Sequence, residues 1–580
     1  MQATGDNAGA LQVLTAGHNS YPDDDGILLN IGRIYSGMGD YLNAVLAFQR
    51  ANQLAPGSLA ILIPFSKALS KGGKIEDALT VSEVSVRLAP NSIPALENAG
   101  EILFKANRLS DVVKCLERLI ALNPDEKRYQ ADFAQMCQIT QRFEKAFVAY
   151  LKLWEDDKAT PADYAMMGRL AFLSHRSDKA IPYLKKALEM EPTSAPSRMY
   201  LGRCYAARGD LKAATSALRR SIAVNPHFLD SYFFLAEIEP FEEGDPAFAT
   251  LEALKREGNL TLENKGALGF ALSRMYHGIA EYDKAFENLK LGNDCTKEVY
   301  ASLGHPPEPE KLDQYYRLLT TLFSAENRKG LKFKGSESAK PIFIIGMPRS
   351  GSTLLEQILS AHSEISTADE RLEMVYIFRD LMARTGHHSG GAHEAALLSL
   401  IDEEGEEIAA SYLEKLEEEG DATAMIIDKL PQNFELLGLI NILFPNAKII
   451  HLRRDPRDVG LSIYSHQYSL DWRYFQDLGD IGFYIRKYRE LMAAWKDIID
   501  LPIHEVDYRA LVEDPEEVAR GVLEFCGQEW QPECLDFHKK PSTVHTASVI
   551  QVRNPINKSA IGKWKTYEKH LGPLIQGLEG

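Results

Sequence analysis

Cysteine is scarce in this sequence: there are six in 580 residues, and no two of them form a C-x-x-C pair. Small secreted domains depend on dense disulfides, and structural zinc sites depend on closely spaced cysteine pairs. The scarcity therefore argues against both and favours a reducing cytoplasm. The six are Cys115, Cys137, Cys204, Cys295, Cys526 and Cys534.

Long apolar runs and positive charge are also in short supply. No window of about twenty apolar residues occurs, and the start MQATGDNAGALQVL has no basic segment before an apolar one. We therefore expect neither a membrane span nor a signal peptide. The formal net charge of −17 argues against nonspecific binding to nucleic acid or to an anionic membrane, although a local basic pocket stays possible.

A period of 34 residues runs through the first half of the chain. Prolines recur at Pro56, Pro90, Pro124, Pro192 and Pro226, separated by 34, 34, 68 and 34 residues. This is the period of tetratricopeptide repeats, in which each unit is a helical hairpin. With 580 residues and 45% hydrophobic content, the chain is also long enough for further cores beyond such an array.

Small and aromatic residues keep the phase of this repeat. Gly and Ala let paired helices approach closely, while Tyr and Phe fill the neighbouring hole. We expect a helical solenoid over residues 8–299, with a weaker last unit near 266–299. Its concave surface is equally suited to a peptide or protein partner and to homo-oligomerisation. The phase-keeping residues include Gly32, Ala44, Phe48, Ala51, Gly168, Ala180, Ala187, Gly202, Ala214, Tyr276, Ala285 and Leu289.

The second half changes character after residue 299. Residues 300–338, rich in proline and then in polar residues, predict a linker with one short helix. From residue 339 to 580, apolar runs alternate with helical patterns, which predicts an α/β domain with a mostly parallel sheet. Ligands of such sheets collect at the C-terminal ends of the strands. The expected strands include 424–427, 447–452 and 503–506, and the acidic run 403–420 is expected to be a solvated helix face.

One loop of this domain has the frame of a phosphate-binding loop. The segment PIFIIGMPRSGSTLL, residues 341–355, predicts strand, loop and helix, and Gly346 to Thr353 match G-x-x-x-x-G-K-[ST] except that Ser352 replaces the lysine. Backbone N–H groups and the helix N-terminus still suit an anion. Without the lysine, the site fits a phosphate-like group other than the outer phosphates of ATP, with Arg349 as a planar donor. An ordinary Gly/Ser-rich turn is the alternative.

Two further strand ends carry basic residues. The strand near 447–452 leads into RRDPRDVGLSIYSH, which places Arg453, Arg454 and Arg457 just before a helix that contains Ser462. This set suits a second, isolated phosphate. Lys429 follows the preceding strand. Pairing of Arg454 with Asp455 or Asp458 and simple solvation of Lys429 are the alternatives.

These motifs resemble those of a known family. The segments PRSGSTLL, HLRRDPRDVGLSIYSH and SVIQVRNPINKSAIGKW are similar to the 5′-phosphosulfate loop, the 3′-phosphate motif and the C-terminal closing segment of sulfotransferases. Those enzymes use 3′-phosphoadenosine 5′-phosphosulfate (PAPS). The closest resemblance is to protein-tyrosine sulfotransferases and their bacterial counterparts fused to tetratricopeptide repeats, and it covers roughly residues 340–580. It implies a P-loop-like α/β fold, no metal, and sulfuryl transfer to a hydroxyl, with adenosine 3′,5′-bisphosphate as product.

The resemblance also implies roles for individual residues. Glu370 aligns with the catalytic base, with Asp369 as its runner-up, because the surrounding residues depart from the family pattern. The implied cations at the transferred group are Arg349 and Lys429, and Ser548 is the implied active-site serine. The implied donor-binding residues are Arg349, Ser350, Gly351, Ser352, Thr353, Arg454, Ser462, Tyr508 and Lys563.

The acceptor and the runner-up functions remain open at the sequence level. Tyrosine of a peptide or protein docked by the repeats is the acceptor that the resemblance favours, and a carbohydrate or small molecule is the alternative. A P-loop kinase or NTPase would explain the loop alone, and Asp428 is then the candidate magnesium ligand. A non-catalytic repeat scaffold would explain the first half alone.

Overall fold

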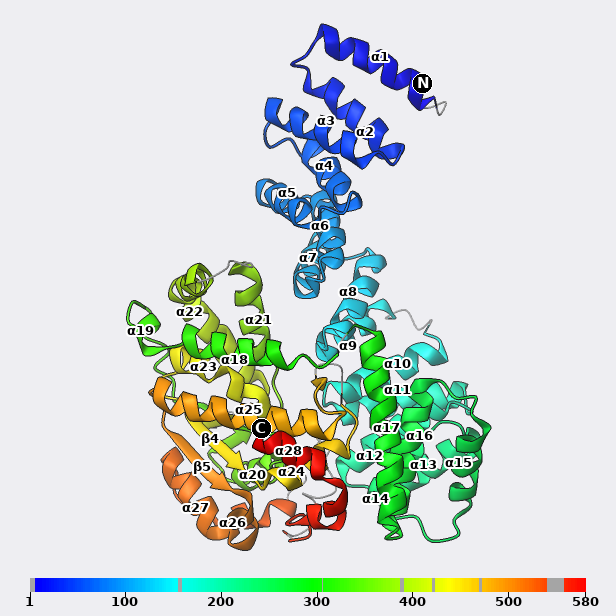
Figure 1. The fold of residues 1–580 in the computed structure, drawn as a ribbon, viewed down its shortest axis with the longest axis vertical. Coiled ribbons are helices and arrows are strands. Elements are labelled where there is room, and N and C mark those ends of the chain that lie inside the picture. The colour runs from blue at the N-terminus through cyan, green and yellow to red at the C-terminus, as the bar shows by residue number, and fades with distance from the viewer. Residues whose placement is uncertain are drawn as a thin grey trace. The chain divides into compact units, whose positions relative to one another are not determined.

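The computed structural model describes residues 6–154, 159–304, 306–385, 391–419, 423–468, 472–539, 556 and 558–580. The chain divides into two compact units, one up to Ala187 and one from Leu188 to Gly580. Figure 1 shows the helices and strands of both units. Within the described ranges, no helix is both long enough and apolar enough to cross a membrane.

The first unit consists of helical hairpins. The first helices of successive hairpins begin at Asp25, Leu59, Ile93, Lys127 and Pro161, each 34 residues after the last. The structure therefore confirms the repeat period. The helices are α1 (Asn7–Ser20), α2 (Asp25–Gly37), α3 (Tyr41–Leu54), α4 (Leu59–Lys71), α5 (Ile75–Leu88), α6 (Ile93–Lys105), α7 (Leu109–Leu122), α8 (Lys127–Ile139), α9 (Phe143–Leu153), α10 (Pro161–Leu173) and α11 (Ser177–Met190), which crosses the boundary between the units.

The repeat residues act by close helix packing. A Cβ atom added at Gly32 would lie 2.5 Å from the ring of Phe48, and one at Gly168 would lie 2.4 Å from Leu184. Only glycine leaves room for these contacts, and Ala44 and Ala51 at the same interfaces are fully buried. The small residues thus set the spacing of the hairpins, as the sequence predicted.

The second unit begins with further hairpins. In the last of them α16 and α17 approach so closely that a Cβ atom at Gly269 would lie 2.6 Å from the backbone nitrogen of Gly292. The helix expected within 300–338 is present as α18, whose Leu319 and Leu322 are fully buried. These helices are α12 (Ala195–Arg208), α13 (Leu211–Val224), α14 (Asp230–Ile238), α15 (Pro246–Glu257), α16 (Leu262–Gly278), α17 (Tyr282–Ser302), α18 (Pro309–Leu322) and α19 (Ala325–Arg328).

A five-stranded parallel sheet forms the centre of the second unit, in the order β2-β3-β1-β4-β5. The chain leaves β1 toward β2 and β3 on one side and then returns to β4 and β5 on the other. The crevice beyond the ends of β1 and β4 is therefore the topological switch point, where such sheets bind ligands. The strands are β1 (Pro341–Gly346), β2 (Ile365–Thr367), β3 (Met425–Asp428), β4 (Lys448–Arg453) and β5 (Ile503–Asp507).

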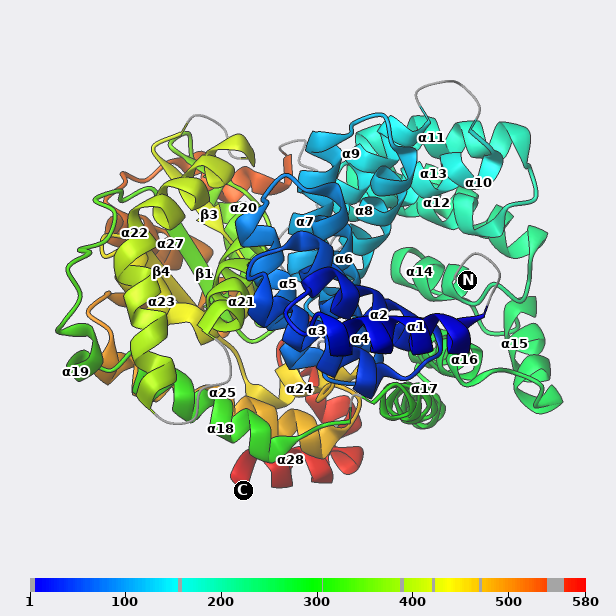
Figure 2. The ribbon, with the colours of Figure 1, turned by 90° about the horizontal axis from the view of Figure 1, so that it is seen from above.

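Helices cover the sheet on both faces, as the alternating pattern predicted (Figure 2). The acidic run expected to be solvated is the end of α22, but one side of that helix, with Tyr412 and Leu416, is buried. The helices are α20 (Ser352–Leu359), α21 (Glu373–Thr385), α22 (Gly391–Glu419), α23 (Leu437–Leu443), α24 (Pro456–Tyr464), α25 (Leu478–Ile498), α26 (Tyr508–Glu513), α27 (Pro515–Cys526) and α28 (Gly572–Glu579), with 3-10 helices η2 (Pro431–Leu436), η4 (Pro532–Lys539) and η6 (Lys563–His570).

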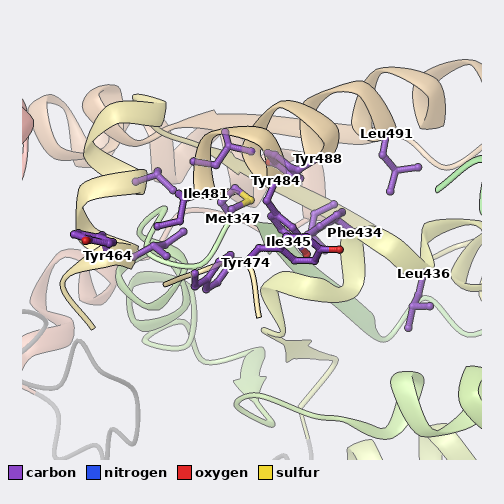
Figure 3. Packing of buried hydrophobic residues seen from close by; sticks show 14 of the residues in the cluster. Ile345, Met347, Phe434, Leu436, Tyr464, Tyr474, Ile481, Tyr484, Tyr488 and Leu491 are labelled. Atoms are coloured by element: carbon purple, nitrogen blue, oxygen red, sulfur yellow. The ribbon is translucent and has the colours of Figure 1, made fainter. Parts of the chain in front are cut away.

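The sheet side chains alternate between two apolar cores. Ile342 and Ile344 face one core, and Phe343 and Ile345 face the other. The second core is continuous with buried residues of α12 to α17, such as Phe270. In Figure 3, Ile345 and other labelled residues gather below the tyrosines of α25. The last helical hairpins and the α/β sheet therefore fold as one body.

Candidate active site

The predicted phosphate-binding loop lies at the end of the central strand β1. Gly351, which precedes α20, has φ +105°, and a Cβ atom there would lie 2.4 Å from the ring of Tyr508. Glycine is required both for the left-handed backbone and for the contact with this ring. The loop thus turns beside Tyr508 at the start of α26, and the first N–H groups of α20 face the loop.

The side chains of this loop suit an anion. Ser350 is buried, and its hydroxyl has no hydrogen-bond partner among the described residues. Arg349 has φ +69°, a backbone conformation that is costly for a residue other than glycine. Ser352 and Thr353 are buried at the start of α20. A strained arginine and an unsatisfied buried hydroxyl are features that functional sites carry and that packing alone does not explain.

The two predicted anion subsites are joined through arginines. Arg349 Nε donates to Ser462 Oγ at 3.1 Å, so the loop after β1 contacts helix α24. Arg454, at the end of β4, donates to the carbonyl oxygens of Arg349 (2.8 Å) and Ala560 (2.5 Å). Its guanidinium lies 4.6 Å from the centre of the Tyr508 ring. Burial lowers the pKa of Arg454 from its usual value, with Arg349 acting in the same direction.

The alternative pairing considered for Arg454 does not occur. Asp455 instead binds Arg457 through both oxygens, at 3.0 and 2.6 Å. Arg453, the other arginine of the motif, points to Glu505 at 2.8 Å and is largely exposed. Of the three arginines, Arg454 is therefore the one that the fold directs to the loop.

Asp458 positions the C-terminal segment, a role that sequence reasoning missed. Its two oxygens accept from the backbone N–H groups of Gly562 (2.7 Å) and Trp564 (2.9 Å), on either side of Lys563. Burial, followed by the charges of Arg274, Arg349 and Arg454, lowers the pKa of Lys563, although the residue as a whole is exposed to solvent. Asp458 stands in the same sequence motif as Arg454, on helix α24, where it is buried. A buried aspartate needs hydrogen-bond donors, and this is the signal that could have identified its role. Ser548 lies outside the described residues.

Lys429 is fully buried at the end of β3, so it is not the solvated lysine of the alternative interpretation. Its Nζ lies 2.6 Å from Glu370, 3.4 Å from Asp369 and 3.6 Å from Glu356. Burial lowers the pKa of a lysine, but the three carboxylates outweigh it and raise the pKa of Lys429. The carboxylates therefore favour the charged form of Lys429.

The two candidate bases lie side by side in the loop between β2 and α21. The side chain of Glu370 is 40% exposed and that of Asp369 is 28% exposed, so an acceptor can approach either. Asp369 has φ +58°, and its carbonyl oxygen accepts from the backbone N–H of Lys429 at 3.0 Å. Glu370 precedes the first residue of α21, Glu373, by three residues, so it belongs to the loop and not to the helix.

Glu356 is the carboxylate that the sequence analysis missed. It is 2% exposed, and Oε1 accepts from Thr367 Oγ1 at 2.5 Å. Burial raises the pKa of Glu356, and the neighbouring Asp369 and Glu370 add to the shift. It is the one charged residue of the apolar α20, which is the signal that could have identified it.

Asp428, the candidate magnesium ligand of a kinase, is committed elsewhere. It is fully buried, accepts from Tyr412 at 2.6 Å through one oxygen, and accepts from Leu430 N (3.2 Å) and Asn433 (3.1 Å) through the other. Burial raises the pKa of Asp428 to about 7. Both of its oxygens already accept hydrogen bonds within the protein, so Asp428 does not suit a magnesium site. Among the residues that the structure describes, no cluster of three potential metal ligands occurs.

Residues 341–532 match the Sulfotransferase family, and residues 26–58 and 171–238 match tetratricopeptide repeats. Over 433 residues the chain is 31% identical to an uncharacterized protein of Aquifex aeolicus (strain VF5), covering 73% of this chain and 56% of that protein.

Two further relatives have named functions. A protein-tyrosine sulfotransferase of Drosophila melanogaster is 29% identical over 244 residues, which is 38% of this chain and 46% of the relative. Protein-tyrosine sulfotransferase 2 of Gallus gallus is 25% identical over 276 residues, or 43% of this chain and 71% of the relative. The chain spans about half the length of the first two relatives. The chain carries a domain of the Sulfotransferase family preceded by tetratricopeptide repeats.

Proposed function

We propose that the chain is a PAPS-dependent sulfotransferase. The observation that carries the proposal is the convergence of Arg349, Arg454, Ser462 and Lys563 on the phosphate-binding loop, in a chain whose net charge is −17. Such a concentration of cations needs an anion of more than one charge. The unsatisfied Ser350 hydroxyl fits the same ligand.

In the proposed site, the donor lies across the ends of β1 and β4. The loop residues Arg349 to Thr353 would hold the 5′-phosphosulfate, since the loop supplies N–H groups and hydroxyls without the lysine of nucleoside triphosphate sites. Arg454 and Ser462 would hold the 3′-phosphate. Tyr508 and Lys563 would flank the nucleotide, with Asp458 keeping Lys563 in place. Ser548 stays a prediction. When bound, PAPS supplies an activated sulfuryl group.

The acid–base part of the mechanism is assigned to the cluster around Lys429. Glu370 accepts the proton of the acceptor hydroxyl, and Asp369 is the runner-up for this role. Three carboxylates share one ammonium here, so the cluster keeps negative charge even where Glu356 holds a proton. The ammonium of Lys429 therefore does not neutralise every carboxylate of the cluster. Lys429 and Arg349 also stabilise negative charge that develops on the leaving oxygen.

Tyrosine of a peptide or protein is the acceptor that we propose, because the named relatives are protein-tyrosine sulfotransferases and repeats suit peptide docking. A carbohydrate or small-molecule acceptor is the alternative. Homo-oligomerisation through the repeats is the second use that we propose for their concave surface. We also propose that the protein is cytoplasmic and that it needs no metal and binds neither nucleic acid nor a membrane.

Ligand-dependent melting tests the donor assignment directly. Adenosine 3′,5′-bisphosphate at 100 times its Kd should stabilise the folded chain by about 2.7 kcal/mol, and ATP with magnesium should not. With PAPS labelled in its sulfate, transfer to tyrosine peptides should continue in excess EDTA. Stabilisation by ATP and magnesium alone, together with loss of transfer in EDTA, would support a kinase instead.

A further inference from the structure

The last helical hairpin, α16–α17, holds the segment that carries Lys563. On α16, His277 Nδ1 lies 2.8 Å from the hydroxyl of Tyr567 in η6. On α17, the ring of Phe286 stacks on His570 at 4.2 Å, and Asp283 lies 2.8 Å from Lys569. Figures 1 and 2 show α17 beside the C-terminal segment, drawn in red. The hairpin is thus a wall of the candidate site.

The same hairpin also holds helix α24, which carries Ser462. Asn293 Nδ2 donates to the carbonyl oxygen of Tyr464 at 2.9 Å, and both groups are buried. Just beyond this helix, Tyr300 donates to the carbonyl oxygen of Tyr468. A repeat element therefore contacts both sides of the donor site, around Ser462 and around Lys563.

Arg274 lies on this wall, one helical turn before His277. Residues three apart share a face of a helix, so Arg274 lies on the side of α16 that meets η6. Its guanidinium stacks on Phe233 at 4.0 Å and forms an ion pair with Glu237 at 2.9 Å. The Nε atom is also buried and has no hydrogen-bond partner among the described residues. Phe233 and Glu237 therefore hold the side chain of Arg274 in place, while its Nε–H group has no acceptor among the described residues.

The charges of Arg274 and of Arg349 in the phosphate-binding loop act on the same histidine, His466. His466, whose Nδ1 donates to the carbonyl oxygen of Ser462 at 2.7 Å, is a common neighbour. Burial lowers the pKa of His466, and the charges of Arg349, Arg274 and Lys563 act in the same direction. Burial and the charges of Lys563 and Arg274 likewise lower the pKa of His277 to about 4. The lowered pKa values favour the neutral form of both histidines, so neither adds positive charge to that of the arginines and Lys563.

We propose that Arg274 completes an oxyanion site with Arg349 and Lys563, so that the last repeat contributes a binding residue to the transfer site. This inference rests on the proposed function for its biological meaning. The three cations come from α16, from the loop after β1 and from η6, and the one carboxylate paired with Arg274 is Glu237. The oxyanion belongs either to the donor, as its phosphosulfate, or to an acidic group on the acceptor. In both cases Arg274 binds the oxyanion directly.

The first test needs no activity. Sodium sulfate, compared with sodium chloride at equal ionic strength, should stabilise the wild-type chain in melting experiments. Arg274→Gln should reduce the apparent affinity for sulfate at least fivefold, and Arg274→Lys should restore part of it. Arg219→Gln is the matched control, because Arg219 also pairs with a glutamate (Glu239, 2.7 Å) but on the exposed surface of α13. An equal sulfate response in wild type and Arg274→Gln overturns the inference.

Two further arms identify the source of the oxyanion. If the donor supplies it, Arg274→Gln weakens adenosine 3′,5′-bisphosphate or PAPS in calorimetry at least fivefold. If the acceptor supplies it, the variant raises KM for a tyrosine peptide flanked by aspartates and leaves KM unchanged for the same peptide with asparagines. No change in either arm contradicts the inference.

A double variant guards against misfolding. Should Arg274→Gln lower the melting temperature by leaving Glu237 unpaired, Arg274→Gln/Glu237→Gln removes both charges, and its sulfate response must show the same loss. A wild-type chain that responds to sulfate through Arg274 but binds no adenosine 3′,5′-bisphosphate would refute the proposed function and leave the oxyanion site standing.

Discussion

Arg454 donates a 2.8 Å hydrogen bond to the carbonyl oxygen of Arg349 and thereby ties the end of β4 to the loop after β1. The two residues flank the topological switch point of the sheet. Arg454 therefore shapes the phosphate-binding loop and also presents its charge to the same crevice. A lysine could supply the charge but not the two carbonyl contacts and the stacking on Tyr508.

Arg454→Ala should weaken adenosine 3′,5′-bisphosphate by about 1.5 to 3 kcal/mol, the value of a hydrogen bond to a charged group. Calorimetric titration measures this change. Arg453→Ala is the matched control, because Arg453 is the neighbouring arginine and is 59% exposed. Equal affinities for the two variants would remove Arg454 from the donor site.

Gly351→Ala should abolish donor binding while leaving the chain folded. The added Cβ would lie 2.4 Å from the Tyr508 ring, and the backbone there has φ +105°. The loop must shift, because neither the strain nor the clash can be relieved locally. Ligand-dependent melting and circular dichroism report the two effects separately. Gly521→Ala, at a helical site where a Cβ meets nothing within 4 Å, is the control.

Glu370→Gln should keep the affinity for adenosine 3′,5′-bisphosphate and lower turnover on the order of 100-fold or more, because the amide cannot accept the acceptor's proton. Single-turnover rates with labelled PAPS measure it. Asp369→Asn is the comparison. If the asparagine variant loses turnover and the glutamine variant does not, the role of base passes to Asp369.

Lys429→Met should destabilise the chain by roughly 3 to 5 kcal/mol, because it leaves buried Glu356 without its counter-charge. Thermal melting gives the change. The double variant Lys429→Met/Glu356→Gln should recover part of the loss, since the orphaned charge is then gone. An undiminished melting temperature for the single variant would contradict the buried ion-pair cluster.

The pH dependence of stability should contain a contribution from His451. Burial lowers the pKa of His451 to about 4, against 6.5 for an ordinary histidine, and its ring contacts the hydroxyl of Tyr488. The unfolded chain then binds a proton that the folded chain does not, so stability falls as pH drops from 6.5 toward 4. By pH 5 the loss is about 2 kcal/mol.

Melting temperatures at pH 7.5, 6 and 5 test this prediction. His451→Gln should show a flatter profile than wild type over this range, because glutamine does not titrate. Parallel profiles for the two proteins would show that the histidine does not stay neutral in the folded state.

Much of the architecture followed from local patterns. The 34-residue spacing of prolines and small residues predicted the hairpins, because every unit meets its neighbour through the same contacts, such as Gly32 on Phe48. Apolar runs predicted β1, β3, β4 and β5 within one or two residues. The three-residue β2 was missed, since so short a strand has no period of its own.

The candidate site divides in the same way. Arg349, Ser350 and Gly351 were readable from the sequence because one loop carries them within a fixed frame. The roles of Glu356 and Asp458 could not be predicted in this way. Glu356 pairs with Lys429 at the end of another strand, and Asp458 accepts a hydrogen bond from Gly562, which is far away in the sequence.

The repeat period, the parallel α/β class and the loop with the frame of a phosphate-binding loop could be read from the sequence, because they depend on residues close together in the chain. The enclosure of Lys429 by three carboxylates, and the neighbour that Arg274 of α16 shares with Arg349, are visible only in the folded chain. Charges and helices from segments hundreds of residues apart meet only through packing, and no local pattern encodes which of them will meet.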